Sequence, residues 1–376
     1  MCVPEHAPIM TELRQTADGS YIPRNILVTG GAGFIGSHVV RYLLRHHPTY
    51  RVIVLDKLDY CASLFNLEEL EGNPSFKFIK GDILSGDLLI YILATENIDT
   101  ILHFAAQTHV DNSFGNSLAF TMNNICGTHV LLEAARTYGL VRRLINVSTD
   151  EVYGETSVGL AQGLPESSPM APTNPYAAAK AGAELMALAY HVSYGLPIIV
   201  TRGNNVYGPG QFPEKLVPKF LMLAQRDEAL PIYGDGLARR SYLYVEDVAE
   251  AYAVLLHRGR LGEVYNIGSQ VERSVLDVAA DVLRIAGRKG EEVVHVRDRP
   301  FNDRRYYIND RKLADLGWSE RTGWEAGLEK TRQWYSEHGG THWDANAVRL
   351  ALTAHPTSPP ASPVLRLDAF SAFLAT

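Results

Sequence analysis

The sequence predicts an α/β fold: a doubly wound parallel sheet with a smaller, mostly helical lobe toward the C-terminus. Short apolar, β-branched runs recur between residues 25 and 201, and amphipathic helical patterns separate them. Strands alternating with helices are typical of parallel sheets, because each crossover between parallel strands needs a dozen or more residues. From about Gln211 the alternation loosens, and residues 211–240 and 270–340 read as the added lobe.

The expected strands follow in chain order. Asn25–Thr29 comes first and runs directly into a glycine cluster. One helical pattern covers 35–44 and a second covers 128–138. The remaining strand candidates are 52–55, 76–79, 101–104, 144–147 and 198–201.

The composition is that of a globular protein with a large core. Of the 376 residues, 46% are hydrophobic and 20% are charged, which excludes general disorder. The 42 acids outnumber the 35 bases, the net charge is −7, and no long Lys/Arg run occurs. We therefore expect neither a nucleic-acid partner nor binding to an anionic membrane.

The cysteines and the N-terminus argue against further classes of protein. Cys2, Cys61 and Cys126 stand at no metal-ligand spacing, so we expect neither a metal site nor disulfides. No apolar run reaches the roughly 18 residues needed to span a bilayer. The N-terminus lacks the basic flank and apolar stretch of a signal peptide, so the expected location is the cytoplasm.

A glycine-rich turn joins the first strand to the first helix. Gly30, Gly33 and Gly36 are spaced three apart there. The first glycine permits the tight turn, the second lets the backbone approach a pyrophosphate, and the third lets the helix pack on the strand. Amides at the helix start then face the phosphates, so the pattern predicts a dinucleotide site. Taken alone, such a triplet also fits an ordinary glycine-rich turn.

Two carboxylates support the dinucleotide prediction. Asp56 ends the second strand, where it can accept hydrogen bonds from both adenosine ribose hydroxyls. It would repel a 2′-phosphate, which favours NAD over NADP, while the neighbouring Lys57 keeps NADP open. Asp82 and Ile83 end the third strand, where a carboxylate can lie near the adenine amine.

A tyrosine and a lysine share one face of a predicted helix. Asn174 is the expected cap, Pro175 the first-turn residue, and Tyr176 and Lys180 stand four apart. A nearby ammonium lowers the pKa of a phenol, so Tyr176 is expected to act as a base near neutral pH. Lys180 can also hold the nicotinamide ribose. Two solvated helix residues are the alternative for this spacing taken alone.

An acid pair stands at the end of the fifth strand, within 148–154. Strand ends of this fold face the ligand crevice. Thr149 can bond a reacting hydroxyl, and Asp150 and Glu151 offer an acid and a base in one place. A simple hydride transfer does not need this acid–base pair. The alternative explanation for two adjacent acids is a solvated turn.

Together these motifs resemble the extended short-chain dehydrogenase/reductase superfamily, which has a Rossmann sheet, and within it the nucleotide-sugar 4,6-dehydratases. The resemblance runs from about Arg24 to Trp334. Its most specific element is STDEVYG (148–154), because related 4-epimerases carry no acid pair there. The plant-type UDP-glucose 4,6-dehydratases, the first domain of rhamnose synthases, resemble it most, and the dTDP-glucose enzymes are second. Further matching stretches are HFAAQTHVDNS (103–113), NVYGPGQFPEKLVPKF (205–220), SYLYVEDVAEAY (241–252), YNIG (265–268) and RPFNDRRY (299–306).

The sequence pattern also indicates how the chain is divided. We expect a flexible arm at 1–23, an NAD-binding domain at 24–210 with returning strand segments near 241–268, a discontinuous substrate-binding lobe at 211–340, and a tail at 341–376. Pro and Ser cluster at 356–363, which favours a tail over packed structure.

Each matching position acquires an implied role. Thr149 would bind the sugar, Asp150 and Glu151 would be acid and base, and Tyr176 and Lys180 would complete the catalytic set. The implied NAD contacts are Gly30, Gly33, Phe34, Ile35, Gly36, Asp56, Lys57, Leu58, Asp82, Ile83, Phe104, Ala105, Ala106, Thr108, Asn123, Tyr176, Lys180 and Val206. The implied substrate contacts are Thr108, Thr149, Asn205, Lys215, Leu216, Pro231, Tyr233, Arg240, Asn266 and Arg299. Gln107 stands where bacterial dTDP enzymes usually have Glu, which affects the subfamily and not the chemistry.

The implied reaction has no net redox change. Tyr176 would take the proton of the sugar 4-hydroxyl as NAD accepts the C4 hydride; Glu151 would remove the C5 proton, Asp150 would protonate the leaving 6-hydroxyl, and the hydride would return to C6. The substrate would be UDP-glucose, or dTDP-glucose in the second reading. More distant alternatives are a 4-epimerase or decarboxylase and a non-catalytic NAD-binding regulator. Relatives form homodimers, and because no second glycine fingerprint follows, we expect a separate epimerase/reductase downstream.

Overall fold

The predicted doubly wound sheet is present in the computed structural model, which describes residues 20–288, 292–298 and 300–353. Its strands lie in the order β10-β6-β5-β4-β1-β2-β3, and every neighbouring pair is parallel. The order reverses between β1 and β4, which makes that crevice the expected ligand position. The strands are β1 (Asn25–Thr29), β2 (Arg51–Asp56), β3 (Phe76–Lys80), β4 (Thr100–His103), β5 (Arg143–Thr149), β6 (Ile198–Gly203) and β10 (Val264–Ile267).

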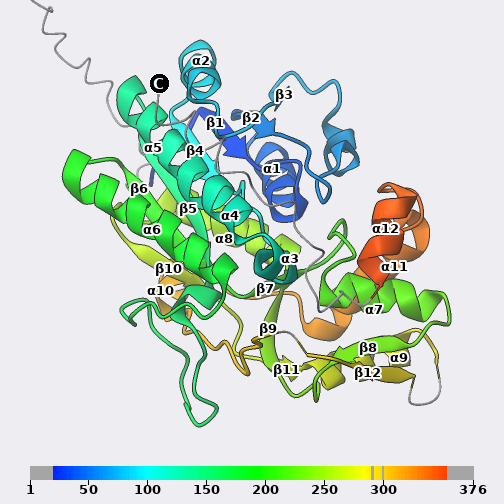
Figure 1. The fold of residues 1–376 in the computed structure, drawn as a ribbon. Helices are drawn as coiled ribbons and strands as arrows, with labels where there is room; N and C mark the ends of the chain where they lie inside the picture. Colours follow the sequence, from blue (N-terminus) through cyan, green and yellow to red (C-terminus); the bar gives the residue numbers. More distant parts are fainter. Residues whose placement is uncertain (1–19, 289–291, 299, 354–376) are drawn as a thin grey trace, which may run out of the picture.

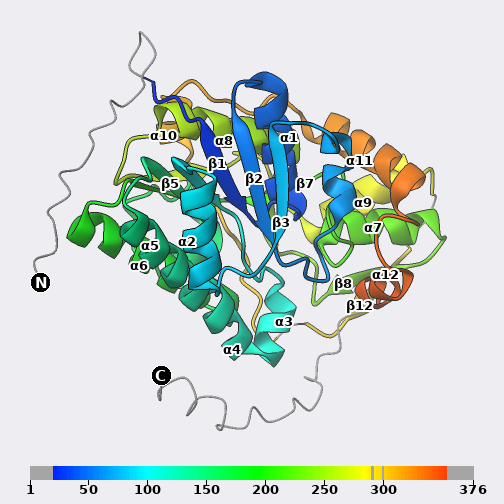
Figure 2. The same ribbon diagram turned by 90° about the horizontal axis from the view of Figure 1, so that it is seen from above.

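Helices cover both faces of this sheet (Figures 1 and 2). One face carries α1 (Phe34–His46) and α8 (Val245–Arg258), and the other carries α2 (Gly86–Thr95), α5 (Gly127–Tyr138) and α6 (Pro175–Tyr194). Successive side chains of β1 serve opposite faces: Ile26 and Val28 join the core with α1 and α8, and Leu27 joins the core with α2, α5 and α6. Strands covered on both sides, such as β1 and β2, bury nearly every residue, which explains their continuous apolar runs; the edge strand β3 is only partly buried.

Helix α6 begins and ends at sequence signals. The Asn174 side-chain oxygen accepts a hydrogen bond from the Ala177 N–H at 2.8 Å, and Pro175 occupies the first turn. This confirms the predicted cap. The helix ends at Gly195, whose φ of +69° is the left-handed conformation that glycine adopts without strain.

The smaller lobe has its own core. Its fully buried side chains include Phe220, Leu230, Val278 and Leu328. A three-stranded sheet joins β7 (Asn205–Tyr207), β9 (Arg239–Tyr244) and β11 (Glu272–Ser274), and a two-stranded sheet joins β8 (Leu230–Tyr233) and β12 (Val293–Val296). The helices of the lobe are α7 (Leu216–Gln225), α9 (Val275–Ile285), α11 (Trp324–His338) and α12 (Ala345–Leu352). The short elements elsewhere are η1 (Leu64–Leu70), α3 (Val110–Gly115), α4 (Ser117–Phe120), η2 (Thr121–Cys126), η3 (Asp150–Tyr153) and α10 (Arg311–Ala314).

The described ends of the expected arm and tail are packed, which corrects both predictions. Tyr21 is buried, and its hydroxyl lies 2.8 Å from the Thr100 Oγ1. At the other end, α12 places Val348 and Leu352 in the core of the lobe. These two residues stand four apart on one helical face, a signal that the Pro/Ser cluster at 356–363 obscured. That cluster and residues 1–19 lie outside the described residues.

The expected returning segment near 241–268 is shared between the two parts of the molecule. Strand β10 adds to the edge of the central sheet beside β6, while β9 pairs with β7 and β11 in the lobe. Between them, α8 packs against α1. Within the described residues, no helix has both the length and the apolar character needed to traverse a bilayer.

Candidate active site

A cleft opens at the carboxyl ends of the central strands, and residues of both the sheet and the lobe line it. Predicted residues on its wall are Gly30, Gly33, Phe34, Ile35, Gly36, Asp56, Lys57, Asp82, Ile83, Phe104, Ala105, Ala106, Thr108, Asn123, Thr149, Glu151, Tyr176, Lys180, Asn205, Val206, Lys215, Leu216, Tyr233 and Arg240. Leu58, Asp150, Pro231 and Asn266 are not on the wall, and Arg299 lies outside the described residues. The fold therefore brings most of the predicted set to one place.

The glycine turn has the geometry that a pyrophosphate site needs. Gly30 has a φ of +72°, and a Cβ there would lie 2.5 Å from the Ala105 nitrogen. A Cβ on Gly36 would lie 2.5 Å from the Gly30 carbonyl oxygen, so only glycine lets α1 pack this close to the turn. Gly33 caps α1 and faces the cleft. The first turn of α1 thus presents its amides to the cleft.

Asp56 is held by the backbone at the end of β2. Its Oδ2 accepts a hydrogen bond from the Ala32 N–H at 3.0 Å, and its Oδ1 accepts one from the Leu58 N–H at 2.8 Å. Burial raises the pKa of this carboxyl. The Leu58 side chain packs against the core of the α1 face and is not part of the cleft wall, so its cofactor contact stays a prediction.

Lys57, the residue after Asp56, does not turn this part of the cleft into a site for a 2′-phosphate. The Lys57 ammonium donates to the Asn123 side-chain oxygen at 2.8 Å. It also lies 3.7 Å from Asp59 and 3.8 Å from Asp82. A lysine already surrounded by acceptors and carboxylates offers little to an added phosphate, so these residues fit NAD better than NADP.

Tyr176 and Lys180 lie side by side on α6 and are both buried, but their electrostatics differ from the prediction. The Lys180 ammonium donates to the Val147 carbonyl at 2.5 Å, and burial lowers its pKa to about 8. Burial first, and the charge of Glu151 second, raise the pKa of the Tyr176 phenol, while a hydrogen bond with Thr149 lowers it. Lys180 is therefore not among the main influences on the pKa of the Tyr176 phenol, and its ammonium is turned to the main chain of β5.

The acid pair divides into a buried and a cleft-facing member. Asp150 is 2% exposed, and its Oδ2 accepts a hydrogen bond from the Asn204 amide at 2.6 Å. Burial, followed by the charge of Glu151, raises the pKa of Asp150 to about 7. Thr149 Oγ1, on the cleft wall, donates to the Asp150 Oδ1 at 3.2 Å. Asp150 therefore holds a proton near neutral pH one layer behind the wall, and Thr149 connects it to the cleft.

Glu151 faces the cleft from η3, and two segments hold its side chain. The Asn174 amide donates to Glu151 Oε2 at 3.0 Å, and the Tyr306 hydroxyl lies 3.5 Å from the same oxygen. Asn174 is also the cap of α6, two residues before Tyr176. The start of α6 therefore positions both the phenol and the second carboxylate.

The lobe contributes cations to the opposite wall. The Arg240 guanidinium lies over the Tyr306 ring, 4.4 Å from its centroid, and donates to the Asp303 carbonyl at 2.8 Å. The Lys215 ammonium donates to the Thr108 carbonyl at 2.8 Å. Both side chains line the cleft, which makes this wall suitable for a diphosphate.

Two predicted substrate contacts, Asn266 and Pro231, do not lie on the cleft wall. The Asn266 amide is fully buried and donates to the Leu164 and Asn309 carbonyls at 3.0 and 2.9 Å. Its oxygen accepts from the Tyr153 hydroxyl at 2.9 Å, so both ends of the side chain already have structural partners. Pro231 is buried in β8, opposite Val294 of β12.

Several residues of the wall were not predicted as site residues. Asp303 and Tyr306 lie beside Glu151, and Asn204 binds Asp150. The signal for the first two was present in RPFNDRRY (299–306), where only Arg299 was taken as a contact. Asn204 precedes a predicted contact, Asn205, but nothing in the local pattern points to a partner 54 residues away.

Comparison with known proteins places this cleft in a family. The family model described as GDP-mannose 4,6 dehydratase matches residues 27–331. A trifunctional UDP-glucose 4,6-dehydratase/UDP-4-keto-6-deoxy-D-glucose 3,5-epimerase/UDP-4-keto-L-rhamnose-reductase of Arabidopsis thaliana is 58% identical over 340 residues, which is 90% of this chain and 50% of that protein. This chain thus spans about half the length of the Arabidopsis relatives it matches. A dTDP-D-glucose 4,6-dehydratase of Mus musculus is 46% identical over 355 residues, which is 93% of this chain and 98% of that protein.

Solved structures extend the comparison to the fold. A dTDP-glucose 4,6-dehydratase from Streptomyces venezuelae with NAD bound has a TM-score of 0.81 and 42% identity, covering 84% of this chain and 98% of that one. A UDP-glucose 4-epimerase from Thermotoga maritima has a TM-score of 0.76 and 33% identity, covering 83% of this chain and 99% of that one. The fold is thus common to two reactions, and only the residues of the site separate them. With the family model matching most of its length, the chain belongs to the GDP-mannose 4,6 dehydratase family.

Proposed function

We propose that this chain is an NAD-dependent UDP-glucose 4,6-dehydratase, a hydro-lyase that forms UDP-4-keto-6-deoxy-glucose. The observation that carries the proposal is the placement of Asp150 and Glu151 next to Tyr176, at one end of a cleft whose glycine turn and Asp56 fit NAD. Oxidation alone would need only the tyrosine, the lysine and the cofactor. The added acid pair fits the loss of water from the oxidised sugar.

The residues of the cleft divide the work of the reaction. The glycine turn and Asp56 would hold NAD, which would supply the acceptor for the C4 hydride and the donor for its return at C6. Tyr176 takes the proton of the 4-hydroxyl, and Thr149 orients that hydroxyl. The pKa of the Tyr176 phenol is raised in the chain alone, and the positive charge of a bound nicotinamide would favour the phenolate. Glu151, facing the cleft, removes the C5 proton, which the adjacent 4-ketone has made acidic, and a proton returns to C5 when the hydride is added at C6. Arg240 and Lys215 hold the diphosphate on the lobe side.

Asp150 supplies the proton for the departing 6-hydroxyl. Its pKa, raised to about 7, keeps it protonated at a pH where an ordinary carboxyl is ionised. Because Asp150 lies behind the wall, its proton reaches the sugar through Thr149. Thr149 gives its own hydroxyl proton to the departing oxygen, and Asp150 Oδ1, 3.2 Å away, replaces that proton on Thr149 Oγ1. Two neighbouring carboxyls thus differ in role because one is buried and the other faces the cleft.

The test of the reaction is product analysis from two substrates given in parallel, UDP-glucose and dTDP-glucose. We expect UDP-glucose to be dehydrated faster, with loss of one water and no net change in NAD, as the plant-type relatives suggest. Equal or faster turnover of dTDP-glucose would indicate that the chain is a dTDP-glucose 4,6-dehydratase. A product isomeric with the substrate would instead indicate the 4-epimerase reaction of the structural relative from Thermotoga.

The product must be consumed by a further enzyme activity. The proposed reaction returns its hydride to the sugar, so a later reduction of the 4-ketone needs a fresh hydride donor. We propose a separate epimerase/reductase site for those steps. Purified protein given UDP-glucose and NADPH should stop at the 4-keto sugar; formation of UDP-rhamnose by this chain alone would contradict the proposal.

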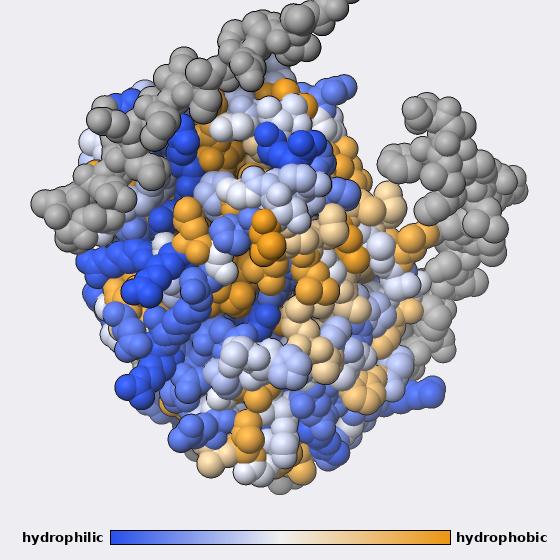
Figure 3. All heavy atoms as spheres, turned by 90° about the vertical axis from the view of Figure 1, so that its left-hand side faces the viewer, coloured by the Kyte–Doolittle hydropathy of each residue, from blue (hydrophilic) through white to orange (hydrophobic). Residues whose placement is uncertain are grey.

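We also propose that two copies of the chain pair through α5 and α6. Figure 3 shows apolar side chains gathered on the face that lies at the left of Figure 1, where these helices run. On α6, Leu185 is 54% exposed and Val192 is 83% exposed, and they stand seven apart on the same helical face. Sedimentation analysis should give a homodimer that Val192→Glu weakens; a wild-type monomer would refute the pairing.

A further inference from the structure

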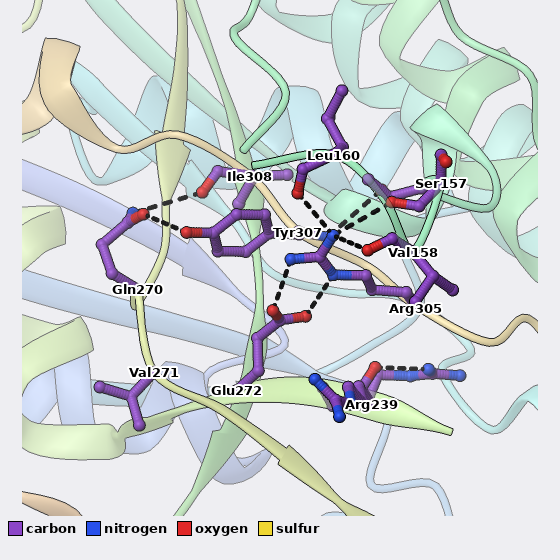
Figure 4. A network of polar contacts seen from close by, with 12 residues as sticks. Ser157, Val158, Leu160, Arg239, Gln270, Val271, Glu272, Arg305, Tyr307 and Ile308 are labelled. Carbon is purple, nitrogen blue, oxygen red and sulfur yellow. Dashed lines mark hydrogen bonds and ion pairs between the residues drawn. The ribbon is translucent and has the colours of Figure 1, made fainter. Parts of the chain in front are cut away.

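Arg305 forms a buried ion pair outside the cleft (Figure 4). Its Nε and Nη2 donate to the two carboxylate oxygens of Glu272 at 2.7 and 2.6 Å. Only 9% of the Arg305 side chain and 13% of the Glu272 side chain are exposed. A bidentate pair with this geometry holds its two segments, the stretch before α10 and strand β11, in one fixed arrangement.

The remaining nitrogen of Arg305 binds a loop that leads to the active site. Its Nη1 donates to the carbonyls of Ser157, Val158 and Leu160 at 3.0, 3.3 and 2.8 Å. These residues belong to the loop 154–174, which begins after η3 and ends at the cap of α6. One guanidinium therefore joins the loop to β11.

The backbone around Arg305 follows the same loop closely. The Thr156 N–H donates to the Arg305 carbonyl at 2.9 Å, and the Leu164 N–H donates to the Tyr307 carbonyl at 2.9 Å. On the other side, the Arg239 N–H donates to the Arg304 carbonyl at 2.7 Å. Residues 304–307 thus lie between the loop and β9, next to isolated β-bridges that pair Arg239 with Arg305 and Leu164 with Ile308.

Consecutive side chains of an extended segment point to opposite sides. Arg305 points to Glu272 and the loop, and its neighbour Tyr306 points into the cleft. There the Tyr306 hydroxyl donates to the Asp303 carboxylate and lies 3.5 Å from Glu151 Oε2. At the far end of the loop, the Thr173 hydroxyl donates to the same Asp303 oxygen at 2.6 Å.

From these contacts we infer that Arg305 is a positioning residue for the proposed base Glu151, acting through Tyr306 and the loop 154–174. The inference rests on the proposed function. Arg305 touches neither the cleft nor Glu151. It determines where the segment 304–307 and the loop lie, and these carry the Tyr306 and Asn174 side chains that contact Glu151. Its influence should be larger on elimination than on oxidation, because Tyr176 is also held by the body of α6 and the NAD side of the cleft by the central sheet, whereas the Glu151 side chain depends on the Tyr306 and Asn174 contacts.

The test compares Arg305→Met with wild type in a single turnover of UDP-glucose, following both the absorbance of bound NADH and the dehydrated product. We expect elimination to slow about 10–100-fold, the cost of a misplaced catalytic group, while C4 oxidation changes less than about threefold. Bound NADH should therefore accumulate, and KM for UDP-glucose should change less than kcat. A merely structural role would lower both steps together, in proportion to the loss of folded protein.

Arg304→Met is the matched control. Arg304 is the preceding residue, and its ion pair with Asp235 is about half exposed on both sides, so loss of that charge should leave both steps unchanged. Arg305→Lys keeps the charge but cannot bind Glu272 and three carbonyls together, and it should show the same NADH accumulation in weaker form. If Arg305→Met does not fold, the comparison of Arg305→Lys with wild type tests the inference.

Two results would overturn the inference. One is an Arg305→Lys enzyme that partitions between oxidation and elimination as wild type does. The other is an equal loss of both steps per folded molecule. A wild-type protein that dehydrates neither UDP-glucose nor dTDP-glucose would overturn the proposed function itself, and that result is distinguishable because it requires no variant.

Discussion

The two walls of the cleft are built in different ways. On the sheet wall, each group comes from a short local motif: the glycine turn at Gly30–Gly36, and Tyr176 and Lys180 one helical turn apart on α6. On the lobe wall, Arg240 and Tyr306 come from segments far apart in the chain, joined by a guanidinium–ring contact of 4.4 Å. A helical spacing positions two side chains through the backbone between them. A contact between distant segments depends on the packing of everything in between.

Glu151 is where the two walls meet. Asn174 holds its carboxylate from the sheet wall and Tyr306 approaches it from the lobe wall. This comparison suggests that changes on the sheet wall stop the reaction at its first step, whereas changes at the meeting point separate oxidation from elimination. Four changes test the distinction, from the largest expected effect on turnover to the smallest.

Tyr176→Phe should have the largest effect. The variant lacks the group that takes the proton of the 4-hydroxyl, so turnover should fall by about 10⁴-fold, the upper end for loss of a general base. Neither NADH nor dehydrated product should form in a single turnover. The fold should persist, since the ring remains in the same buried position beside Phe120. Rapid NADH formation by this variant would show that another group is the first base.

Glu151→Gln should separate the two halves of the reaction. The amide keeps the shape of the carboxylate but cannot remove the C5 proton, so dehydration should slow by about 10²–10⁴-fold. Oxidation at C4 should survive, because its proton goes to Tyr176. Single-turnover absorbance should therefore show bound NADH with little product. Dehydration at the wild-type rate would mean that Glu151 is not the C5 base.

The pH dependence of elimination should report the buried member of the acid pair. Asp150 donates only while protonated, and its pKa is raised to about 7, so the elimination rate should fall about tenfold per pH unit above that value. The sign follows from the direction: the proton is present below about pH 7 and lost above it. Asp150→Asn should be slow throughout and lack this break. A wild-type elimination rate that stays flat from pH 6 to 9 would contradict the assignment of Asp150 as the acid.

Leu352→Ala should leave turnover almost unchanged, because α12 lies outside both walls. Leu352 is 7% exposed in the core of the lobe, so its truncation should lower the free energy of unfolding by about 2–3 kcal/mol. Chemical denaturation would measure the loss, and kcat per folded molecule should stay within about twofold. An unchanged stability would indicate that α12 contributes little to the lobe in solution.

The difference between the two walls also explains how much of the fold and of the site could be predicted from the sequence alone. The parallel sheet, the glycine turn, the cap at Asn174 and the spacing of Tyr176 and Lys180 all follow from patterns within a few residues, because backbone geometry translates such spacing directly into position. Most of the cofactor wall was predictable for this reason.

Other features depend on which distant segments pack together, and only the tertiary structure decided them. Burial of Asp150 beside Asn204 raises the pKa of its carboxyl. The main chain of β5 binds the Lys180 ammonium, which is thereby turned away from Tyr176. The Asn266 amide is hydrogen-bonded to the main chain and does not reach the cleft. Local pattern cannot report desolvation or a partner a hundred residues away, and these two quantities determine which of the gathered side chains remain available for chemistry.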